Sequence, residues 1–471
     1  MKNRWRLGMA LLASALGTLA LSAWLWSDEP KETTTSQSVV RLTTETVPMV
    51  LAVEPKPLSA AVRKGLRYLA DTQRPDGGWG QGGGWRTNLA NSGRIEGNNV
   101  PDPSDVGNTC FALLALFRAG NTPVAGEYRV AVRKGLEFVL HHVERADRDS
   151  LHITDVFGTQ LQSKIGRYVD TFMANLVLSE MRGKAGDLEP RVAAALEKTM
   201  NKIVRHQTPE GGFVGNDGWA SVLSVAIAHK GILRAREQGV LVKQEVLERI
   251  VRQNRLALDE RSARPTPGGP DGRLGSGRVP ADRAFPGMPS DAGIALYRVA
   301  SGINNMQGVV NSLAQEAAEA QRVLASAQAG ESEKREAARK LDEFRRAAAE
   351  NERFQADVRR RLQDRRFVAG FGNNGGEEFL SFLQISESLL FRGGKDWEEW
   401  DRRITQELEK AQNPDGSWQG QHCITGRTFC TAAALLVLMA DRTPFPAQVL
   451  QAERERAKKE ARPSVNAPPE K

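Results

Sequence analysis

Apolar residues recur every three or four positions along most of the chain from residue 58 onward, which is the spacing of one helix face. Two kinds of helix alternate. Those with an apolar stripe opposite a face rich in Lys, Arg and Glu are expected at the outside of the fold; they are predicted at about 58–73, 128–143, 190–206, 241–255 and 397–411. Those apolar nearly all round are expected to be buried; they are predicted at about 105–119, 167–182, 217–235, 290–301, 376–391 and 426–441. The alternation predicts an all-α fold of helical hairpins.

The stretch 306–366 has a different pattern, in which Ala, Glu, Arg and Gln dominate and apolar residues are sparse. This composition is typical of a coiled coil. Gly330 interrupts it, which favours an antiparallel helical hairpin inserted into the fold and projecting from it. Two interpretations stay open: a solvated pair of long outer helices, or an arm that docks a protein partner. If one of its helices supplies a missing outer helix, the count reaches six hairpins.

A short motif of the form Q-x-P-[DE]-G-[GS]-[WF] occurs three times, each time after an amphipathic helix. Proline two residues after the glutamine cannot continue the helix, and an acidic residue followed by glycine makes a tight turn. The aromatic residue is then expected to pack back on the helix end. The residues of the three copies that we assign to this structural role are Gln73, Asp76 and Trp79; Gln207 and Phe213; and Gln412, Asp415 and Trp418. Repetition at such long intervals indicates a repeat architecture.

Lys64 to Trp79 resembles the QW motif, K-G-x-x-Y-L-x-x-x-Q-x-x-D-G-x-W, of the terpene cyclase and prenyltransferase superfamily, which includes the squalene-hopene cyclases. The resemblance implies an (α/α)6 toroid or barrel of six helical hairpins, which we place at 57–445. In that superfamily the motif joins the outer helices.

The two ends of the chain differ from the rest. Residues 1–26 begin with Lys2, Arg4 and Arg6 and continue as an uncharged apolar run long enough to span a bilayer. They predict a signal anchor, with a cleaved signal peptide as the alternative, and place the rest of the protein on the extracytoplasmic, periplasmic side of a membrane. Residues 27–56 are expected to form a disordered tether, and 446–471 a disordered tail.

The net charge of +8 comes from interspersed Lys and Arg rather than from a basic block, which argues against nucleic acid as a partner. A Pro- and Gly-rich loop at 262–288 is long enough to be functional or disordered.

The resemblance directs attention to Asp105, because class II terpene cyclases protonate their substrate with the middle Asp of D-x-D-D-T-A. In this chain the similar segment runs from Asp105 to Cys110, and only Asp105 and Thr109 match. Asn108 cannot give up a proton, and a strongly acidic carboxyl is what such chemistry needs. Asp105 therefore stays a candidate acid in a chain that has lost the D-x-D-D pattern.

Prenyltransferase β subunits of the same superfamily hold zinc with Asp-x-Cys and a distant His. Here Thr428 stands in place of the Asp before Cys430, and Thr is a poor zinc ligand. Closure of six hairpins would nevertheless bring together four residues that can bind zinc: Cys110, His422, Cys423 and Cys430. Buried structural cysteines or one disulfide are the alternatives.

Other acids near the predicted starts of buried helices are read as helix caps rather than catalytic groups; they are Asp170, Asp217, Asp291, Glu377 and Glu378. Binding candidates at the expected cavity are Asn108, Phe111, Trp219 and Arg427. The sequence therefore predicts a membrane-tethered toroid that binds an apolar ligand, isoprenoid-like or peptide, or acts as a scaffold. The alternative is an isomerase or transferase of the terpene cyclase or prenyltransferase type, acting through Asp105 or a Cys/His metal site.

Overall fold

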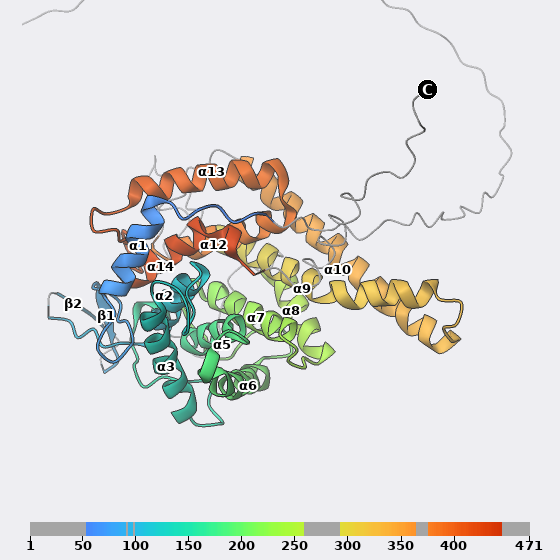
Figure 1. The fold of residues 1–471 in the computed structure, drawn as a ribbon, viewed down its shortest axis with the longest axis horizontal. Helices are drawn as coiled ribbons and strands as arrows, with labels where there is room; N and C mark the ends of the chain where they lie inside the picture. The colour runs from blue at the N-terminus through green and yellow to red at the C-terminus, as the bar shows by residue number, and fades with distance from the viewer. Residues whose placement is uncertain (1–52, 91–92, 98, 259–292, 364–374, 445–471) are drawn as a thin grey trace, which may run out of the picture. The chain divides into compact units, whose positions relative to one another are not determined.

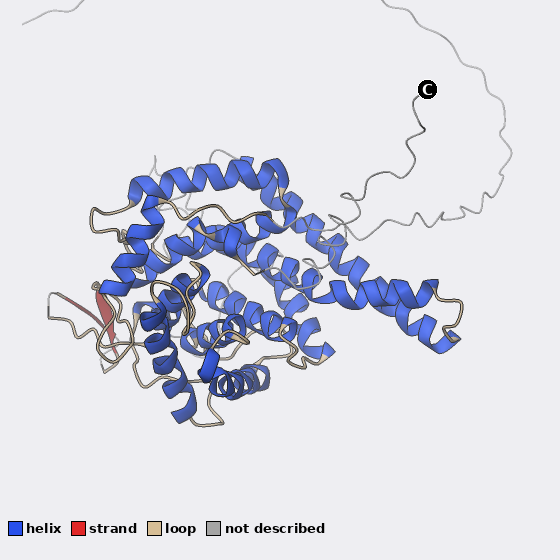
Figure 2. Ribbon diagram, viewed as in Figure 1, coloured by secondary structure: helices blue, strands red, loops and turns tan. Residues whose placement is uncertain are grey.

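The computed structural model describes residues 53–90, 93–97, 99–258, 293–363 and 375–444. Within these ranges the fold is mostly helical, which confirms the predicted all-α class (Figures 1 and 2). A small hairpin of β1 (Trp85–Asn88) and β2 (Gly93–Glu96) was not predicted; it is antiparallel, with Trp85 opposite Glu96. The predicted anchor 1–26, the loop 262–288 and the tail 446–471 fall outside the described residues. Among the residues described, no helix has both the length and the apolar character needed to cross a membrane.

Among the described helices, six form the interior, and each contacts the next in chain order, with the last also contacting the first. They are α2 (Val106–Arg118), α5 (Val169–Met181), α7 (Ser221–Glu237), α9 (Gly293–Ala325), α12 (Glu378–Arg392) and α14 (Arg427–Leu438). We call them the inner helices. Every residue of α2 and α5 is buried, as expected for helices that are apolar nearly all round.

In the described part of the chain, six amphipathic helices lie outside, each against one or two inner helices (Figure 1). They are α1 (Ala60–Asp71), α3 (Arg129–Arg145), α6 (Glu189–His206), α8 (Gln244–Leu258), α10 (Glu331–Gln363) and α13 (Gly394–Ala411). We call them the outer helices. In α1, for example, Val62, Leu66 and Leu69 bury one face, and the Ser59 hydroxyl caps the N-terminus by accepting a hydrogen bond from Val62 N. Shorter elements are α4 (Gln160–Ile165), η1 (Gly186–Leu188) and η4 (Ala440–Arg442).

The three repeated motifs form the same turn. Each has one glycine with a left-handed backbone, at φ 88° for Gly77, 90° for Gly211 and 89° for Gly416. A residue with a side chain adopts this conformation only at a cost, which explains the glycine in every copy. In the first copy Gly77 N donates to Arg74 O, and equivalent bonds close the other two turns.

The first and third motifs also join neighbouring outer helices. The side-chain amide of Gln73 donates to Ala131 O of α3, and that of Gln412 donates to Ala61 O of α1, both at 2.9 Å. Trp79 and Trp418 are fully buried, and each indole donates to a carbonyl of the preceding outer helix. The last motif therefore links the end of the helical chain to its beginning.

The second motif has a smaller aromatic residue. Gly211 lies against Arg249 O, as Gly77 lies against Lys134 O and Gly416 against Lys64 O. In the two copies with Trp, the residue after the contacted lysine is a glycine, Gly135 or Gly65. In the second copy, the residue after Arg249 is Ile250. The Phe213 ring packs on Phe172, with ring centroids 4.7 Å apart.

The inserted hairpin begins within an inner helix. We expected a buried helix ending near residue 301 and a separate stretch from 306, but α9 is continuous from Gly293 to Ala325. Its first half is buried at Tyr297, Ile303 and Met306 and contacts α7 and α12, and its second half runs alongside α10. The chain reverses between Ala325 and Glu331. Figure 1 shows the ends of α9 and α10 extending beyond the other helices. No proline interrupts residues 293–325, so nothing in the backbone forces the expected break.

The last residues of the predicted tether belong to the folded part. Lys56 N donates to Asp441 at 2.7 Å, and the Lys56 ammonium lies 2.5 Å from Asp401 on α13. The folded part therefore includes Lys56, which lies before the expected boundary at 57.

Candidate functional site

Asp105 is a buried helix cap. Its carboxylate accepts hydrogen bonds from the backbone and the side-chain amide of Asn108, at 2.8 and 2.9 Å, and its side chain is fully buried. Burial, and secondly the charge of Asp170, raise the pKa of Asp105 to about 7. Asp105 is therefore protonated in part at neutral pH, but no substrate reaches its oxygens in this conformation.

Asp170 lies beside Asp105 and bridges two inner helices. It is in the first turn of α5, yet its Oδ1 accepts from Gly107 N at the start of α2, at 2.9 Å, and its Oδ2 accepts from Gln162 at 2.8 Å. Burial raises its pKa to about 6, despite these hydrogen bonds. The two carboxyl groups hold the N-terminal ends of α2 and α5 together, so the capping role predicted for Asp170 extends to a neighbouring helix.

The four predicted zinc ligands do not form a metal site. Cys110 and Cys430 are fully buried, and Cys430 Sγ lies 3.6 Å from Ile424 O. Cys423 is half-buried, and its Sγ lies 3.1 Å from His422 Nδ1. Across the described ranges, no group of three or more His, Cys, Asp or Glu side chains is placed to hold a metal ion. Burial raises the pKa of all three thiols, so none is activated as a thiolate.

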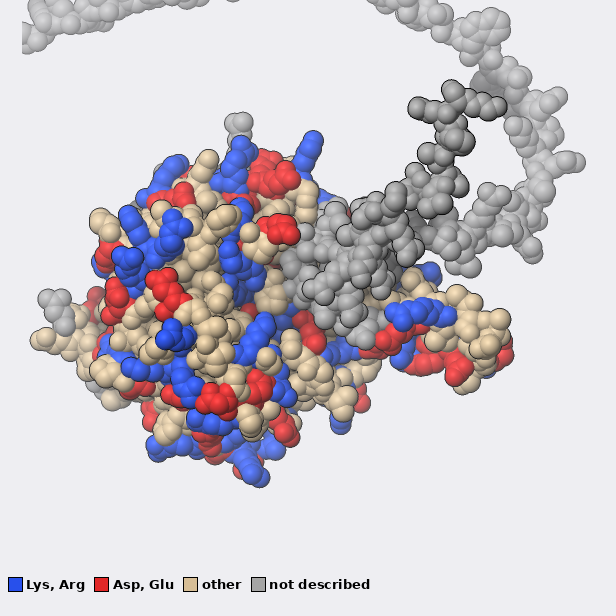
Figure 3. Space-filling model, viewed as in Figure 1, with Lys and Arg blue, Asp and Glu red and all other residues tan. Residues whose placement is uncertain are grey.

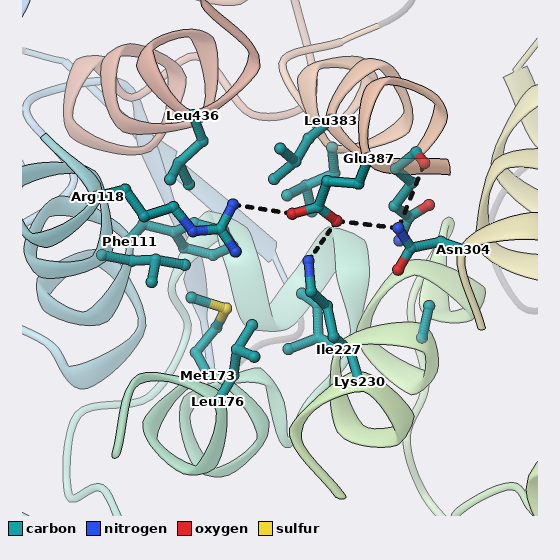
Figure 4. A pocket seen from close by; sticks show the side chains of 14 residues that line it. Phe111, Arg118, Met173, Leu176, Ile227, Lys230, Asn304, Leu383, Glu387 and Leu436 are labelled. Atoms are coloured by element: carbon teal, nitrogen blue, oxygen red, sulfur yellow. Dashed lines mark hydrogen bonds and ion pairs between the residues drawn. The ribbon is translucent and has the colours of Figure 1, made fainter. Parts of the chain in front are cut away.

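Between the inner helices, where we expected a binding cavity, lies a cavity with a volume of about 20 Å³, room for about one water molecule. Side chains from all six inner helices line it, as Figure 4 shows. Phe111 is one of them, packed edge-to-face on Phe429 with ring centroids 4.8 Å apart. An isoprenoid does not fit in this cavity.

Charged side chains meet at one end of this cavity. Glu387 of α12 accepts from Arg118 of α2 at 2.8 Å, from Asn304 of α9 at 2.9 Å, and from Lys230 of α7 (Figure 4). Arg118 also pairs with Glu180 of α5 at 2.7 Å. Burial alone would raise the pKa of Glu387, but Lys230 and Arg118 outweigh it and lower the pKa to about 2. Burial lowers the pKa of Lys230 to about 8. This network ties the inner helices together at that end.

Polar side chains close the opposite end. Gln160, at the start of α4, is almost fully buried, and its side-chain oxygen accepts from the backbone amides of Thr425 and Gly426 at 2.8 and 2.9 Å. Gln160 N donates to the Gln81 side chain at 2.6 Å. The glycine-rich segment around Gln81, α4 and the loop before α14 therefore seal the N-terminal end of the inner helices.

A far larger hollow lies beside this seal, at the N-terminal ends of α5 and α7. Its volume is about 900 Å³. We call it the rim groove; its lining includes Leu89, His152, Phe157, Lys164, Arg167, Asp217 and Trp219. Trp219, a binding candidate from the sequence, is 47 % exposed here. Asp217 was expected to cap α7, but α7 begins four residues later and its cap position is Ala220.

The remaining candidate residues contact helix ends or the repeated motif. Asn108 is buried against Asp105, and Arg427 pairs at 2.8 Å with Asp415 of the third motif, away from the interior. Glu377 occupies the cap position of α12 without a capping hydrogen bond. Glu378 lies in the first turn of α12, as expected, and Asp291 falls outside the described residues.

Sequence reasoning missed the ionic network and the rim groove. A signal for the network was present, because Arg118, Glu180, Lys230 and Glu387 are charged residues within otherwise apolar helices, and buried charges need partners. The chain matches no protein-family model.

Proposed function

We propose that this protein is a binding scaffold of the (α/α)6 toroid type, with an interior closed to ligands. Three observations support the toroid: the cycle of contacts among the inner helices, the outer helix beside each of them, and the repeated motif that links consecutive outer helices. The resemblance to the terpene cyclase and prenyltransferase superfamily is part of this proposal. So are the N-terminal membrane anchor and an extracytoplasmic location, which rest on residues 1–26.

The partner binds at the rim groove rather than between the inner helices. The observation that carries this is the contrast in volume, about 20 Å³ inside against about 900 Å³ at the rim. Pockets for ligands have volumes of roughly 300–1,000 Å³. The groove also exposes Trp219, and tryptophan is strongly enriched among the residues that dominate protein–protein binding energy. A segment of a partner protein is therefore the proposed occupant.

Figure 3 is consistent with such a scaffold, since the visible face has positive and negative side chains interspersed. That face has no basic tract of the kind that binds nucleic acid. The tip of the hairpin formed by α9 and α10 is a second candidate for a protein contact, since most positions from Ala327 to Arg335 are exposed.

Acid catalysis by Asp105 is the second candidate function. The observation in its favour is the pKa of about 7, which keeps part of the carboxyl protonated at neutral pH as a general acid requires. It would need the polar seal at Gln160 to open. Incubating the protein with squalene, and analysing the products against Asp105→Asn, tests it; product formation that depends on Asp105 would replace the scaffold proposal.

The scaffold function is tested by selecting a displayed random-peptide library on the full-length protein in detergent. We expect enriched peptides whose binding is lost in Trp219→Ala and kept in Leu241→Ala. Leu241 is 98 % exposed and lies outside the groove, so its substitution controls for loss of a surface apolar side chain. Enrichment that is equal on both variants, or no enrichment, contradicts the proposal.

A further inference from the structure

We propose that the rim groove is a pH-sensitive site, in which ionisation of two buried carboxyl groups loosens the wall formed by α4. The two groups are Asp105 and Asp170, which we call the carboxyl pair. Gln162 connects the pair to the groove, because it lines the groove and binds Asp170. The device belongs to the groove itself and acts whether or not a partner is bound.

Gln162 holds together three segments of the chain. Its side-chain amide donates to Val156 O at 2.9 Å and to Asp170 Oδ2 at 2.8 Å. Its backbone amide donates at 3.1 Å to the hydroxyl of Thr159, the cap of α4. One side chain therefore connects the loop before α4, α4 itself and the first turn of α5.

The segments that Gln162 connects carry residues of the groove lining. Phe157 follows Val156 directly and is 42 % exposed in the groove. Lys164 of α4 accepts at its backbone carbonyl from Ala220 N, at 2.7 Å, which fastens the Trp219 loop to α4. Movement of α4 would therefore change the position of Trp219 relative to Phe157.

The carboxyl pair is buried at the start of two inner helices. Asp105 is fully buried and Asp170 is almost so. The pair flanks Gly107, where a Cβ atom would lie 3.4 Å from Asp170 Oδ1 and 3.6 Å from Asp105 Oδ1. Burial disfavours a charged carboxylate, and a second carboxylate nearby disfavours it further. Ionisation of the pair therefore destabilises the packed arrangement around it.

The charged neighbours of the pair do not remove this cost. Arg86 of β1 lowers the pKa of Asp105, but burial outweighs it. On α2, the Cys110 thiol is neutral, since burial raises its pKa. On the other elements packed nearby, Lys164 of α4 lies over an indole ring, and Lys202 of α6 and His229 of α7 bind backbone carbonyls.

The pKa values set the direction of the effect. Burial raises the pKa of Asp170 to about 6 although Gln162 and Gly107 donate to it. Movement of α4 that admits water would let this pKa fall toward its usual value of about 3.9. A carboxyl whose pKa is lower in the open state favours that state when it is ionised. The closed wall is therefore most stable below about pH 4 and loses stability as the pH rises through about 6.

His152 in the groove lining also titrates in this range, with the opposite sign. Its ring packs on Phe157 and Tyr168, with centroids 5.4 and 4.9 Å apart, and burial lowers its pKa. Protonation of this imidazole would therefore loosen the groove as the pH falls. The direction of the pH response distinguishes the two sensors.

Hydrogen–deuterium exchange of the full-length protein in detergent, corrected for the intrinsic rate at each pH, measures the opening of α4. Protection of residues 160–165 in wild type should fall on the order of tenfold from about pH 5 to 8, since one pKa unit corresponds to a tenfold change in an equilibrium. It should stay below the protection of residues 110–118 of α2 at each pH. Equal protection of the two helices would mean that α4 opens only by unfolding, which contradicts the proposal.

Variants assign the response to a residue. Asp170→Asn keeps the shape of the side chain without its charge and should abolish the fall. His152→Phe keeps the aromatic packing and should leave the fall unchanged. Gln162→Leu removes the link between α4 and the pair and should lower the protection of α4 throughout the pH range. Circular dichroism verifies that the variants fold.

Three results would overturn the role of the carboxyl pair: a fall that persists in Asp170→Asn, protection in wild type that is constant or rises with pH, and loss of the response in His152→Phe. If Asp170→Asn does not fold, Gln162→Leu decides, and unchanged protection of α4 in that variant would contradict the connection. No partner is present in these measurements, so their outcome is independent of the peptide selection that tests the scaffold function.

Discussion

Trp418 packs its indole ring directly on the backbone of Gly65, joining the last repeated motif to the first outer helix. A Cβ atom on Gly65 would lie 2.9 Å from Cζ3 of Trp418, closer than real Cβ atoms approach. The same distance separates a Cβ on Gly135 from Cζ3 of Trp79. Each glycine is inside a helix and has no left-handed backbone, so it is needed for space rather than for conformation.

Replacing Gly65 by valine should destabilise the protein by about 1–3 kcal/mol, because the added methyl groups overpack the contact with Trp418 and Leu435. Urea unfolding measures the change. Ala60→Val, at an exposed position of the same helix, controls for the helix propensity of valine and should cost about 0.6 kcal/mol or less. Equal stability of the two variants would contradict the packing role.

Truncating either buried tryptophan should be more costly. Trp79→Ala and Trp418→Ala are each expected to lose about 3–5 kcal/mol, since each leaves a large cavity between helices. Thermal melting of these variants beside Trp219→Ala provides the comparison. Trp219 is half exposed, so the melting temperature of its variant should stay close to wild type; a similar loss in all three would show that burial does not explain the effect.

Glu387→Gln should destabilise the protein by about 3–5 kcal/mol, because it leaves the buried cations Arg118 and Lys230 without their shared carboxylate. Glu144→Gln breaks the exposed pair with Arg191 and should cost less than about 1 kcal/mol. Denaturant titrations near pH 7 distinguish them. If the two substitutions cost the same, the network does not hold the inner helices together.

The buried carboxyl of Asp105 predicts a pH dependence. Its folded pKa of about 7 is above the unfolded value of about 3.9, so the folded protein binds more protons between these values. The stability from this group is fully present below about pH 4 and decreases as the pH rises to about 7, by at most roughly 1.4 kcal/mol per pH unit. Asp105→Asn should remove the part of the decrease that comes from Asp105, while Asp170, whose pKa is also raised, keeps its own part. Unfolding free energies of both proteins from about pH 4.5 to 8 test it, and parallel profiles would exclude a buried, titrating Asp105.

The inserted hairpin should separate into a dispensable tip and an integral base. Replacing residues 322–336 with a short flexible linker should preserve the melting temperature, because these residues are mostly exposed. Deleting 309–364 should unfold the protein, since it removes the buried Val309, Leu313, Phe344 and Val358. Circular dichroism reports both results. A stable protein after the larger deletion would show that the hairpin is an appendage throughout.

The sequence determined the local structure of this protein. Periodic apolar residues located eleven of the helices, and the repeated motif located three turns, because helix faces and left-handed glycines depend on residues close together in the chain. The motif at Lys64 to Trp79 also predicted a contact between the aromatic residue and a helix end. It did not predict that Gly135 and Gly65 make room for the indole rings.

Only the tertiary structure decided what the inner helices enclose. The size of a cavity between them depends on side-chain volumes contributed by all six helices, and the cavity that all six line here is about 20 Å³. Arg118 meets Glu387 across most of the chain length, and Trp219 and Arg167 come to line one groove through loops between helices. No local pattern encodes such pairings, since they arise from packing between distant segments.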